Sequence, residues 1–243
     1  MDIVDMIREA RSVLVFTGAG VSTLCGIPDF RGPDGLHQRV DADRIFALDG
    51  FLEDPSFYYR HARDFIYAMG DVEPGPAHRL CAALERQGLI AGVVTQNIDM
   101  LHQRAGSRNV VELHGSPERH VCLRCGATED FATVAPLVRD GVMPRCPGCD
   151  EVLKPAITFF GEMLPEGALE TAGAWAAAAD LVLVLGSSLV VQPAASVPLL
   201  TVRAGGRLAI VNRDPTPLDG LADWRADDLL AFCGLLDKGL GPA

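Results

Sequence analysis

The sequence predicts an α/β fold in which helices cover both faces of a parallel sheet. Short apolar runs such as Val13–Phe16 and Leu181–Leu185 alternate with helical patterns along the chain. Strands buried on both faces have such near-continuous apolar sequences. Several of these runs end in glycine-rich or polar segments, and a cysteine-rich stretch over about 118–152 interrupts the alternation.

The expected elements follow from apolar periodicity and from proline and glycine at helix ends. Pro55 and Pro76 stand near the start of two helices, and Gly88 closes the second. We expect helices over 2–10, 54–67, 77–87, 165–179, 193–204 and 227–236, and strands or extended segments over 13–16, 90–95, 109–113, 156–160, 181–185 and 207–211.

Composition narrows the classes of function. The 243-residue chain carries a net charge of −11 and is 49% hydrophobic, so a basic surface for direct nucleic-acid binding is not expected. A cationic partner such as a lysine-rich protein tail would be attracted. The N-terminus lacks the pattern of a signal peptide, and no apolar run is long enough for a bilayer. We therefore expect a cytoplasmic protein with no membrane partner.

Polar segments follow the expected strands and are predicted to meet in one crevice. The carboxyl ends of parallel strands share one edge of a sheet, where ligands bind. These segments are Gly18–Arg31, Gln96–His102, His114–Gly115, Gly186–Ser188 and Asn212–Asp214.

The turn Gly18-Ala19-Gly20 after the first strand indicates a phosphate site. Glycines permit close approach of a ligand, and a helix N-terminus favours a diphosphate. A turn that serves only the fold is the alternative. Thr23 replaces the third glycine of the usual dinucleotide motif, which makes a hydride-transferring enzyme the second choice. The continuation over 26–32 mixes a proline, an acid, an aromatic and a base, as in a loop that touches a ligand.

Two Cys-x-x-Cys pairs predict a metal site. Cys122 and Cys125 precede Cys146 and Cys149 by about twenty residues, a spacing typical of tetrahedral zinc. Four thiolates leave no open position, so the zinc would be structural. An iron–sulfur cluster and a redox dithiol are the alternatives.

Other polar groups suit catalysis or binding. Gln96, Asn97 and Asp99 could recognise a ribose and a carboxamide, or Asp99 could simply cap a turn. His114, at a strand end, is the first candidate for a general base, although a lone histidine is more often structural. His102 is expected to pack or cap, and His37, His61, His78 and His120 have no supporting neighbours. Gly186, Ser187 and Ser188 suit a phosphate, whereas Phe160–Gly161 and Leu189–Val191 could offer unpaired backbone to a peptide strand.

Together these motifs resemble the sirtuin (Sir2) family of NAD-dependent protein deacylases, in its compact bacterial form. The resemblance covers nearly the whole chain. It rests on the Gly18 turn with Gly26-Ile-Pro-Asp-Phe-Arg31, Thr95-Gln-Asn-Ile-Asp99, Leu101-His102, His114-Gly115, the four cysteines, Phe160-Gly-Glu162, Gly186-Ser-Ser-Leu189 and Val211-Asn212.

The resemblance implies a discontinuous Rossmann-like NAD-binding domain over 1–29, 71–117 and 153–243. A smaller inserted domain would combine a helical insertion over 30–70 with the zinc module over 118–152. NAD⁺ and an acyl-lysine peptide or protein would bind between the domains, with one structural Zn²⁺ per chain.

The family's residue roles carry over to matching positions. His114 is implied as the general base, with Asn97 and Asp99 completing the catalytic set. Gln96 and Asn97 would hold the ribose beside nicotinamide, and Ile98 and Asp99 the carboxamide. The remaining NAD contacts would be Gly18, Ala19, Gly20, Thr23, Phe30, Arg31, Gly186, Ser187, Ser188, Asn212 and Asp228, and the substrate contacts Phe160, Gly161, Leu189 and Val191.

The implied reaction begins when the acyl oxygen attacks the ribose C1′, which releases nicotinamide and forms an alkylimidate. His114 then takes a proton from the ribose hydroxyls so that their oxygen attacks the imidate, and water completes the formation of free lysine and O-acyl-ADP-ribose. A protein ADP-ribosyltransferase on the same scaffold and a non-catalytic NAD-sensing module are the rival functions.

The sequence also bears on the acyl group. Relatives that prefer acidic acyl groups carry Tyr-x-x-Arg, a motif that would fall at Ala62 and Phe65 here. Without that cation we expect acetyl or other neutral groups to be preferred over succinyl. Lys154 stands where the family usually has arginine.

Overall fold

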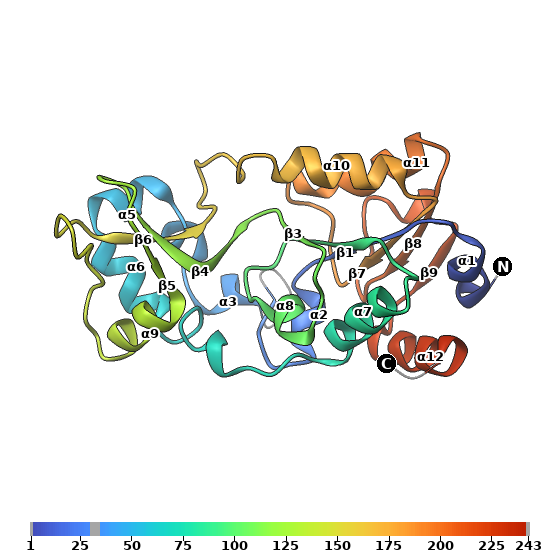
Figure 1. Ribbon diagram of the computed structural model, residues 1–243, viewed down its shortest axis with the longest axis horizontal. Coiled ribbons are helices and arrows are strands. Elements are labelled where there is room, and N and C mark those ends of the chain that lie inside the picture. The colour runs from blue at the N-terminus through green and yellow to red at the C-terminus, as the bar shows by residue number, and fades with distance from the viewer. Residues whose placement is uncertain (1, 30–34, 242–243) are drawn as a thin grey trace.

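The computed structural model describes residues 2–29 and 35–241 (Figure 1). Its larger sheet has six parallel strands in the order β3-β2-β1-β7-β8-β9. They are β1 (Val13–Thr17), β2 (Gly92–Thr95), β3 (Val110–Glu112), β7 (Leu181–Leu185), β8 (Arg207–Val211) and β9 (Trp224–Ala226). This is the strand order of dinucleotide-binding folds, and it reverses direction between β1 and β7.

Helices cover both faces of this sheet, because successive strand residues point to opposite sides. Val13 and Val15 join the apolar cluster under α1 (Ile3–Glu9), α7 (Pro76–Arg86) and α12 (Leu229–Leu240). Leu14 and Phe16 join the cluster under α10 (Ala168–Ala178) and α11 (Val197–Arg203). Figure 1 shows these two layers above and below the sheet.

A second region contains a three-stranded antiparallel sheet in the order β5-β4-β6. Residues from the expected helical insertion and from the expected zinc module pack together in one core of aromatic and aliphatic side chains. The elements are α3 (Leu36–Arg39), α4 (Ala42–Ile45), α5 (Leu48–Glu53), α6 (Pro55–Ala62), η1 (Met69–Asp71), β4 (Gly115–Cys122), β5 (Thr128–Asp130), α9 (Phe131–Arg139) and β6 (Leu153–Ile157).

Short elements complete the fold: α2 (Gly20–Thr23), α8 (Leu101–Ala105), η2 (Ala194–Ser196) and η3 (Asp219–Leu221). Within the described ranges, no helix combines the length and the apolar character needed to cross a bilayer.

The predicted fold class is confirmed, with local corrections. The helix expected over 54–67 ends at Ala62, and the extended segment expected over 156–160 is the strand Leu153–Ile157. The last helix starts later than expected, at Leu229, because the Asp228 side chain accepts a hydrogen bond from Ala231 N and caps it. The edge strand β9 and the long strand β4 had no clear sequence signal.

Candidate active site

All five polar segments predicted to converge line one cavity of about 1270 Å³. The cavity lies at the carboxyl ends of the parallel strands and includes the reversal point between β1 and β7. Its lining residues include Gly18, Ala19, Gly20, Thr23, Gln96, Asn97, Ile98, Asp99, His114, Gly186, Ser187, Ser188, Asn212 and Asp228. Phe30 and Arg31 lie outside the described residues.

The glycine turns after β1 and β7 interlock. Gly20 N donates to Gly186 O (2.8 Å), and a Cβ on Gly20 would stand only 2.7 Å from Gly186 Cα. Gly186 has a φ of 60°, a left-handed conformation that favours glycine. Close approach of the neighbouring turn therefore requires these glycines. The helix that follows is a single turn, Gly20–Thr23.

Ser22 joins the two polar groups at the end of β2, although sequence reasoning gave it no role there. Its Oγ donates to Asp99 Oδ2 (2.6 Å) and accepts from Asn97 Nδ2 (3.1 Å). Asn97 Nδ2 also donates to Gly18 O (3.1 Å), so the amide nitrogen faces the glycine turn. These bonds fix Asn97 and Asp99 against the first loop of the cavity.

Asp99 is both a site residue by position and a local cap. Its Oδ1 accepts from Leu101 N (3.0 Å), which satisfies a donor at the start of α8. The side chain is buried but borders the cavity. Asp99 can therefore bind a ligand and cap a turn, the two roles that the sequence allowed. His102 is buried and packs edge-on against His78, with ring centroids 4.8 Å apart.

His114 presents one ring nitrogen as a potential base. Its Nδ1–H donates to Gln96 O (2.8 Å), which leaves the lone pair of a neutral ring on Nε2. Burial lowers the pKa of His114, and the bond to Gln96 O partly opposes that shift. The imidazole is therefore neutral at pH 7. Gln96 Nε2 in turn donates to Ser187 Oγ (2.7 Å), which connects the segment after β2 to the turn after β7.

The expected substrate residues divide into two groups. Phe160 and Val191 line the cavity, whereas Gly161 and Leu189 do not. The expectation of unpaired backbone at Phe160 is wrong, because Phe160 N donates to Phe46 O (2.7 Å) and Phe160 O accepts from Leu48 N (3.1 Å). The Leu189 side chain is 3% exposed and packs in the core below α10 and α11.

Lys154 supports the turn after β6 from a buried position. Its Nζ lies 2.8 Å from Glu162 Oε2 and donates to Ile157 O (2.9 Å). The same Glu162 oxygen accepts from Phe159 N (2.7 Å). Lys154 Nζ also lies 4.1 Å from the centroid of the Phe159 ring. A buried charge needs such partners, and Lys154 has them in Glu162, the Ile157 carbonyl and the Phe159 ring.

The four predicted metal ligands come together. Their Sγ atoms lie within 4.8 Å of one another, with close pairs at 3.4, 3.5 and 3.6 Å. Tetrahedral Zn–S bonds of about 2.3 Å place sulfurs about 3.8 Å apart, so the group fits one structural zinc. The ligands are Cys122, Cys125, Cys146 and Cys149.

Apolar side chains line the part of the cavity formed by the second region, among them Phe65, Met69 and Ile157. Ala62, where the Tyr-x-x-Arg motif was expected to fall, is fully buried. Of the described residues that line the cavity, Arg213 is the one arginine or lysine, and it follows β8.

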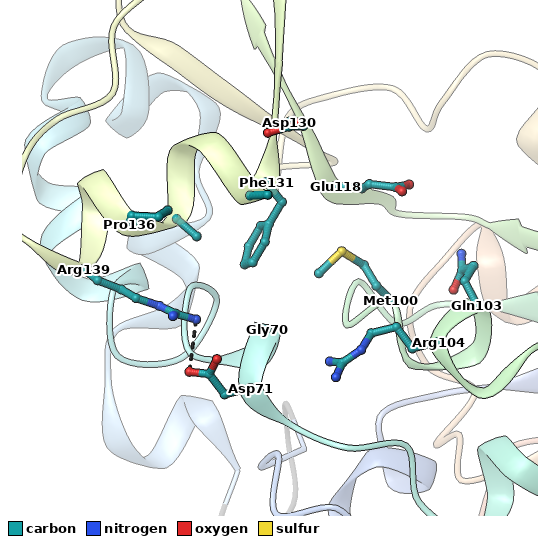
Figure 2. Close-up of a pocket in the computed structure, with 12 residues that line it drawn as sticks. Gly70, Asp71, Met100, Gln103, Arg104, Glu118, Asp130, Phe131, Pro136 and Arg139 are labelled. Atoms are coloured by element: carbon teal, nitrogen blue, oxygen red, sulfur yellow. Dashed lines mark ion pairs between the residues drawn. The ribbon is translucent and has the colours of Figure 1, made fainter.

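A second cavity, of about 500 Å³, lies between α8, β4, η1 and α9. Figure 2 shows the side chains that line it. The Phe131 ring and Met100 extend into it, and Arg139 Nη2 pairs with Asp71 Oδ2 at 3.2 Å. None of the predicted site residues that the structure describes lines this cavity.

Comparison with known proteins identifies the family. The profile of the Sir2 family matches residues 18–193. The chain is 46% identical to the NAD-dependent protein deacetylase of Thermotoga maritima over 91% of this chain and 89% of the relative. It is 42% identical to NAD-dependent protein deacylase 2 of Archaeoglobus fulgidus, covering 90% and 87%.

Solved structures agree with this comparison. A Sir2 variant with deacetylated p53 peptide and 3′-O-acetyl ADP ribose superposes with a TM-score of 0.93 at 43% identity, covering 99% of this chain and 98% of that one. A complex of Sir2 with p53 peptide and NAD⁺ gives 0.89 at 44% identity, covering 97% and 96%. This protein belongs to the Sir2 family.

Proposed function

We propose that the protein is an NAD-dependent protein-lysine deacylase that transfers the acyl group to ADP-ribose and releases nicotinamide. The observation that carries the proposal is the single cavity that brings His114, the Asn97–Asp99 segment and the interlocked glycine turns together. The names of the relatives and the ligands of the similar structures support it.

The residues after β2 would bind the nicotinamide half of the dinucleotide. Gln96 and Asn97 would hold its ribose, and Ile98 and Asp99 its carboxamide. The buried carboxylate and amides provide the few well-placed polar groups that such a pocket needs. Asn97 Nδ2 is occupied by protein acceptors, which leaves Oδ1 to accept from a ligand hydroxyl.

The turns after β1, β7 and β8 would bind the other half. Backbone N–H groups and hydroxyls suit a diphosphate. The proposed contacts are Gly18, Ala19, Gly20, Thr23, Phe30, Arg31, Gly186, Ser187, Ser188, Asn212 and, near adenine, Asp228. The side chain of Asp228 already accepts from Ala231 N, so a ligand would share its carboxylate.

His114 would act as the general base. Bound NAD⁺ supplies an electrophilic ribose carbon that can take the acyl oxygen while nicotinamide leaves. Neutral His114 accepts a proton at Nε2 from a ribose hydroxyl, and the bond from Nδ1–H to Gln96 O stabilises the cation that forms. The resulting oxygen can then attack the acyl carbon.

An acyl-lysine peptide would enter beside the Phe160 side chain and Val191, which line the cavity, with Gly161 and Leu189 as flanking positions of the same two segments. We place the protein in the cytoplasm, as expected in the sequence analysis. We assign it no nucleic-acid partner, on the basis of its charge of −11. We keep the two-domain division given above, with β4 and β6 as the strands that link the domains.

The test is incubation with an acetyl-lysine peptide and NAD⁺. We expect nicotinamide release that depends on the peptide, with O-acetyl-ADP-ribose and free lysine in the mass spectrum. ADP-ribosylated protein in place of these products would favour the transferase. Loss of the oxidised cofactor without nicotinamide release would indicate a dehydrogenase.

We further propose that neutral acyl groups are preferred. The apolar lining at Phe65, Met69 and Ile157 offers a succinyl carboxylate no cation. On matched peptides, removal of acetyl should be at least about 10-fold faster than removal of succinyl, since burying an unpaired carboxylate costs more than 1.4 kcal/mol. Faster removal of succinyl would contradict this preference.

A further inference from the structure

His78 is a fully buried histidine of α7 for which the proposed reaction has no use. It does not line the main cavity, yet both of its ring nitrogens have polar neighbours. Nδ1 faces the start of α7, and Nε2 faces Ser22 of α2, which lines the cavity.

The hydrogen bonds of His78 set its tautomer. Gly75 N–H donates to Nδ1 (3.2 Å), and the Cys25 thiol lies 3.7 Å from the same nitrogen. Burial lowers the pKa of His78, so the ring is neutral at pH 7. A neutral ring that accepts at Nδ1 carries its proton on Nε2.

This tautomer directs the Ser22 hydroxyl. His78 Nε2–H points to Ser22 Oγ at 3.4 Å, and Asn97 Nδ2 donates to the same oxygen at 3.1 Å. With both lone pairs of Ser22 Oγ engaged, its proton goes to Asp99 Oδ2 at 2.6 Å. The orientation of Asp99 therefore depends on a donor that is supplied from behind the cavity wall.

The position of the imidazole is itself fixed. His102 packs edge-on against His78 and contacts Thr17 Oγ1 through Nε2 at 3.0 Å. Burial lowers the pKa of His102 to about 3, so this second ring also stays neutral and brings no competing charge. His78 therefore has little freedom to leave Ser22.

We propose that His78 is a positioning residue for the nicotinamide half of the site. Acting through Ser22, it holds the Asp99 carboxylate in the orientation that accepts a carboxamide N–H. This inference rests on the proposed function, because it assumes that Asp99 binds nicotinamide. It predicts a selective effect on nicotinamide, with little effect on the peptide.

A purely structural role for His78 is the competing explanation, because Nδ1 also satisfies the Gly75 N–H at the start of α7. Two substitutions separate the roles. The Asn amide oxygen can reproduce the acceptor at Nδ1, so His78→Asn keeps the cap and loses the donor to Ser22. The longer Gln amide can reproduce the donor at Nε2, so His78→Gln keeps that donor and loses the cap.

The experiment compares wild type, His78→Asn and His78→Gln for inhibition by nicotinamide, KM of the acetyl peptide and melting temperature. His78→Asn should raise the nicotinamide inhibition constant about 3- to 10-fold, the effect of one hydrogen bond, with the peptide KM unchanged. His78→Gln should melt at a lower temperature and keep an inhibition constant within about twofold of wild type. Thr201→Val, which removes a buried hydroxyl bonded to Ala176 O in α10, is the control and should leave inhibition unchanged.

An unchanged inhibition constant in His78→Asn would overturn the inference, as would equal effects on nicotinamide and peptide. A wild type that releases no nicotinamide in the presence of peptide would overturn the proposed function and this inference together.

Discussion

The two regions that border the main cavity are held together by different means. At the sheet edge, backbone hydrogen bonds and interlocked turns position the polar groups, as between Gly20 and Gly186. In the second region, four cysteines and a cluster of aromatic rings around Phe159 replace a large sheet. The first region should therefore stay folded when one side chain is lost, whereas the folding of the second should depend on its metal.

Zinc removal should give the largest effect. Zinc contributes roughly 10–16 kcal/mol in small zinc peptides, so Cys149→Ser or chelation should unfold the region that contains β4, β5, β6 and α9. Hydrogen exchange should rise there while the six-stranded sheet stays protected. Cys233→Ser, which changes a buried cysteine of α12 far from the metal group in sequence, is the control. Uniform loss of protection across both sheets would show that the regions are not independent.

Replacement of His114 tests the region at the edge of the six-stranded sheet. His114→Ala should lower turnover by roughly 10²-fold or more, about 2.7 kcal/mol in activation free energy, because the general base is lost. NAD⁺ affinity and melting temperature should change little, since the strands around it supply the fold. Calorimetry and steady-state kinetics measure both. Near-normal turnover in this variant would refute the assignment of the base.

The glycine interlock provides a third test. Gly20→Ala should cost about 2 kcal/mol, because the new Cβ would meet the backbone of Gly186. Denaturant unfolding should show that loss, and NAD⁺ should bind more weakly. Gly234→Ala in α12 is the matched control, as a Cβ there has open space and a helical alanine stabilises. Equal stability of the two variants would contradict the interlock.

Glu112 at the end of β3 provides the last test, whose outcome depends on pH. Burial raises its pKa to about 7, and Oε1 has no hydrogen-bond partner among the described residues. Since the folded pKa lies above the unfolded value, the protonated group is favourable at low pH, and that stability is lost as pH rises through 7. Glu112→Gln should therefore stabilise by about 3 kcal/mol at pH 8 and by almost nothing at pH 4. Equal effects at both pH values would exclude a buried carboxylate as the cause.

Sequence patterns predicted the residues at the sheet edge well, because each strand and the polar turn after it are neighbours in the sequence. An apolar run followed by a glycine turn or a polar triplet is visible in one window, as at Val13–Gly20 and Val93–Asp99. Parallel topology then brings the ends of such windows together. The four cysteines were likewise found from their spacing alone.

The residues that were missed depend on contacts between distant segments. Ser22 and His78 were missed; Ser22 contacts both His78 and the predicted Asp99, and nothing near His78 in the sequence indicates its partner. The pairing of Phe160 with Phe46 and Leu48 also joins distant parts of the chain. Lys154 was noted as a substitution, but its carboxylate partner, Glu162, is evident only in three dimensions.

The fit between Gly20 and Gly186 has a consequence for how such proteins can evolve. Each residue occupies the space that a methyl group on the other would need. Neither position can accept a larger residue until the opposite turn moves away, so each glycine prevents substitution of the other. Among descendants of a common ancestor, the two should change together or stay as they are.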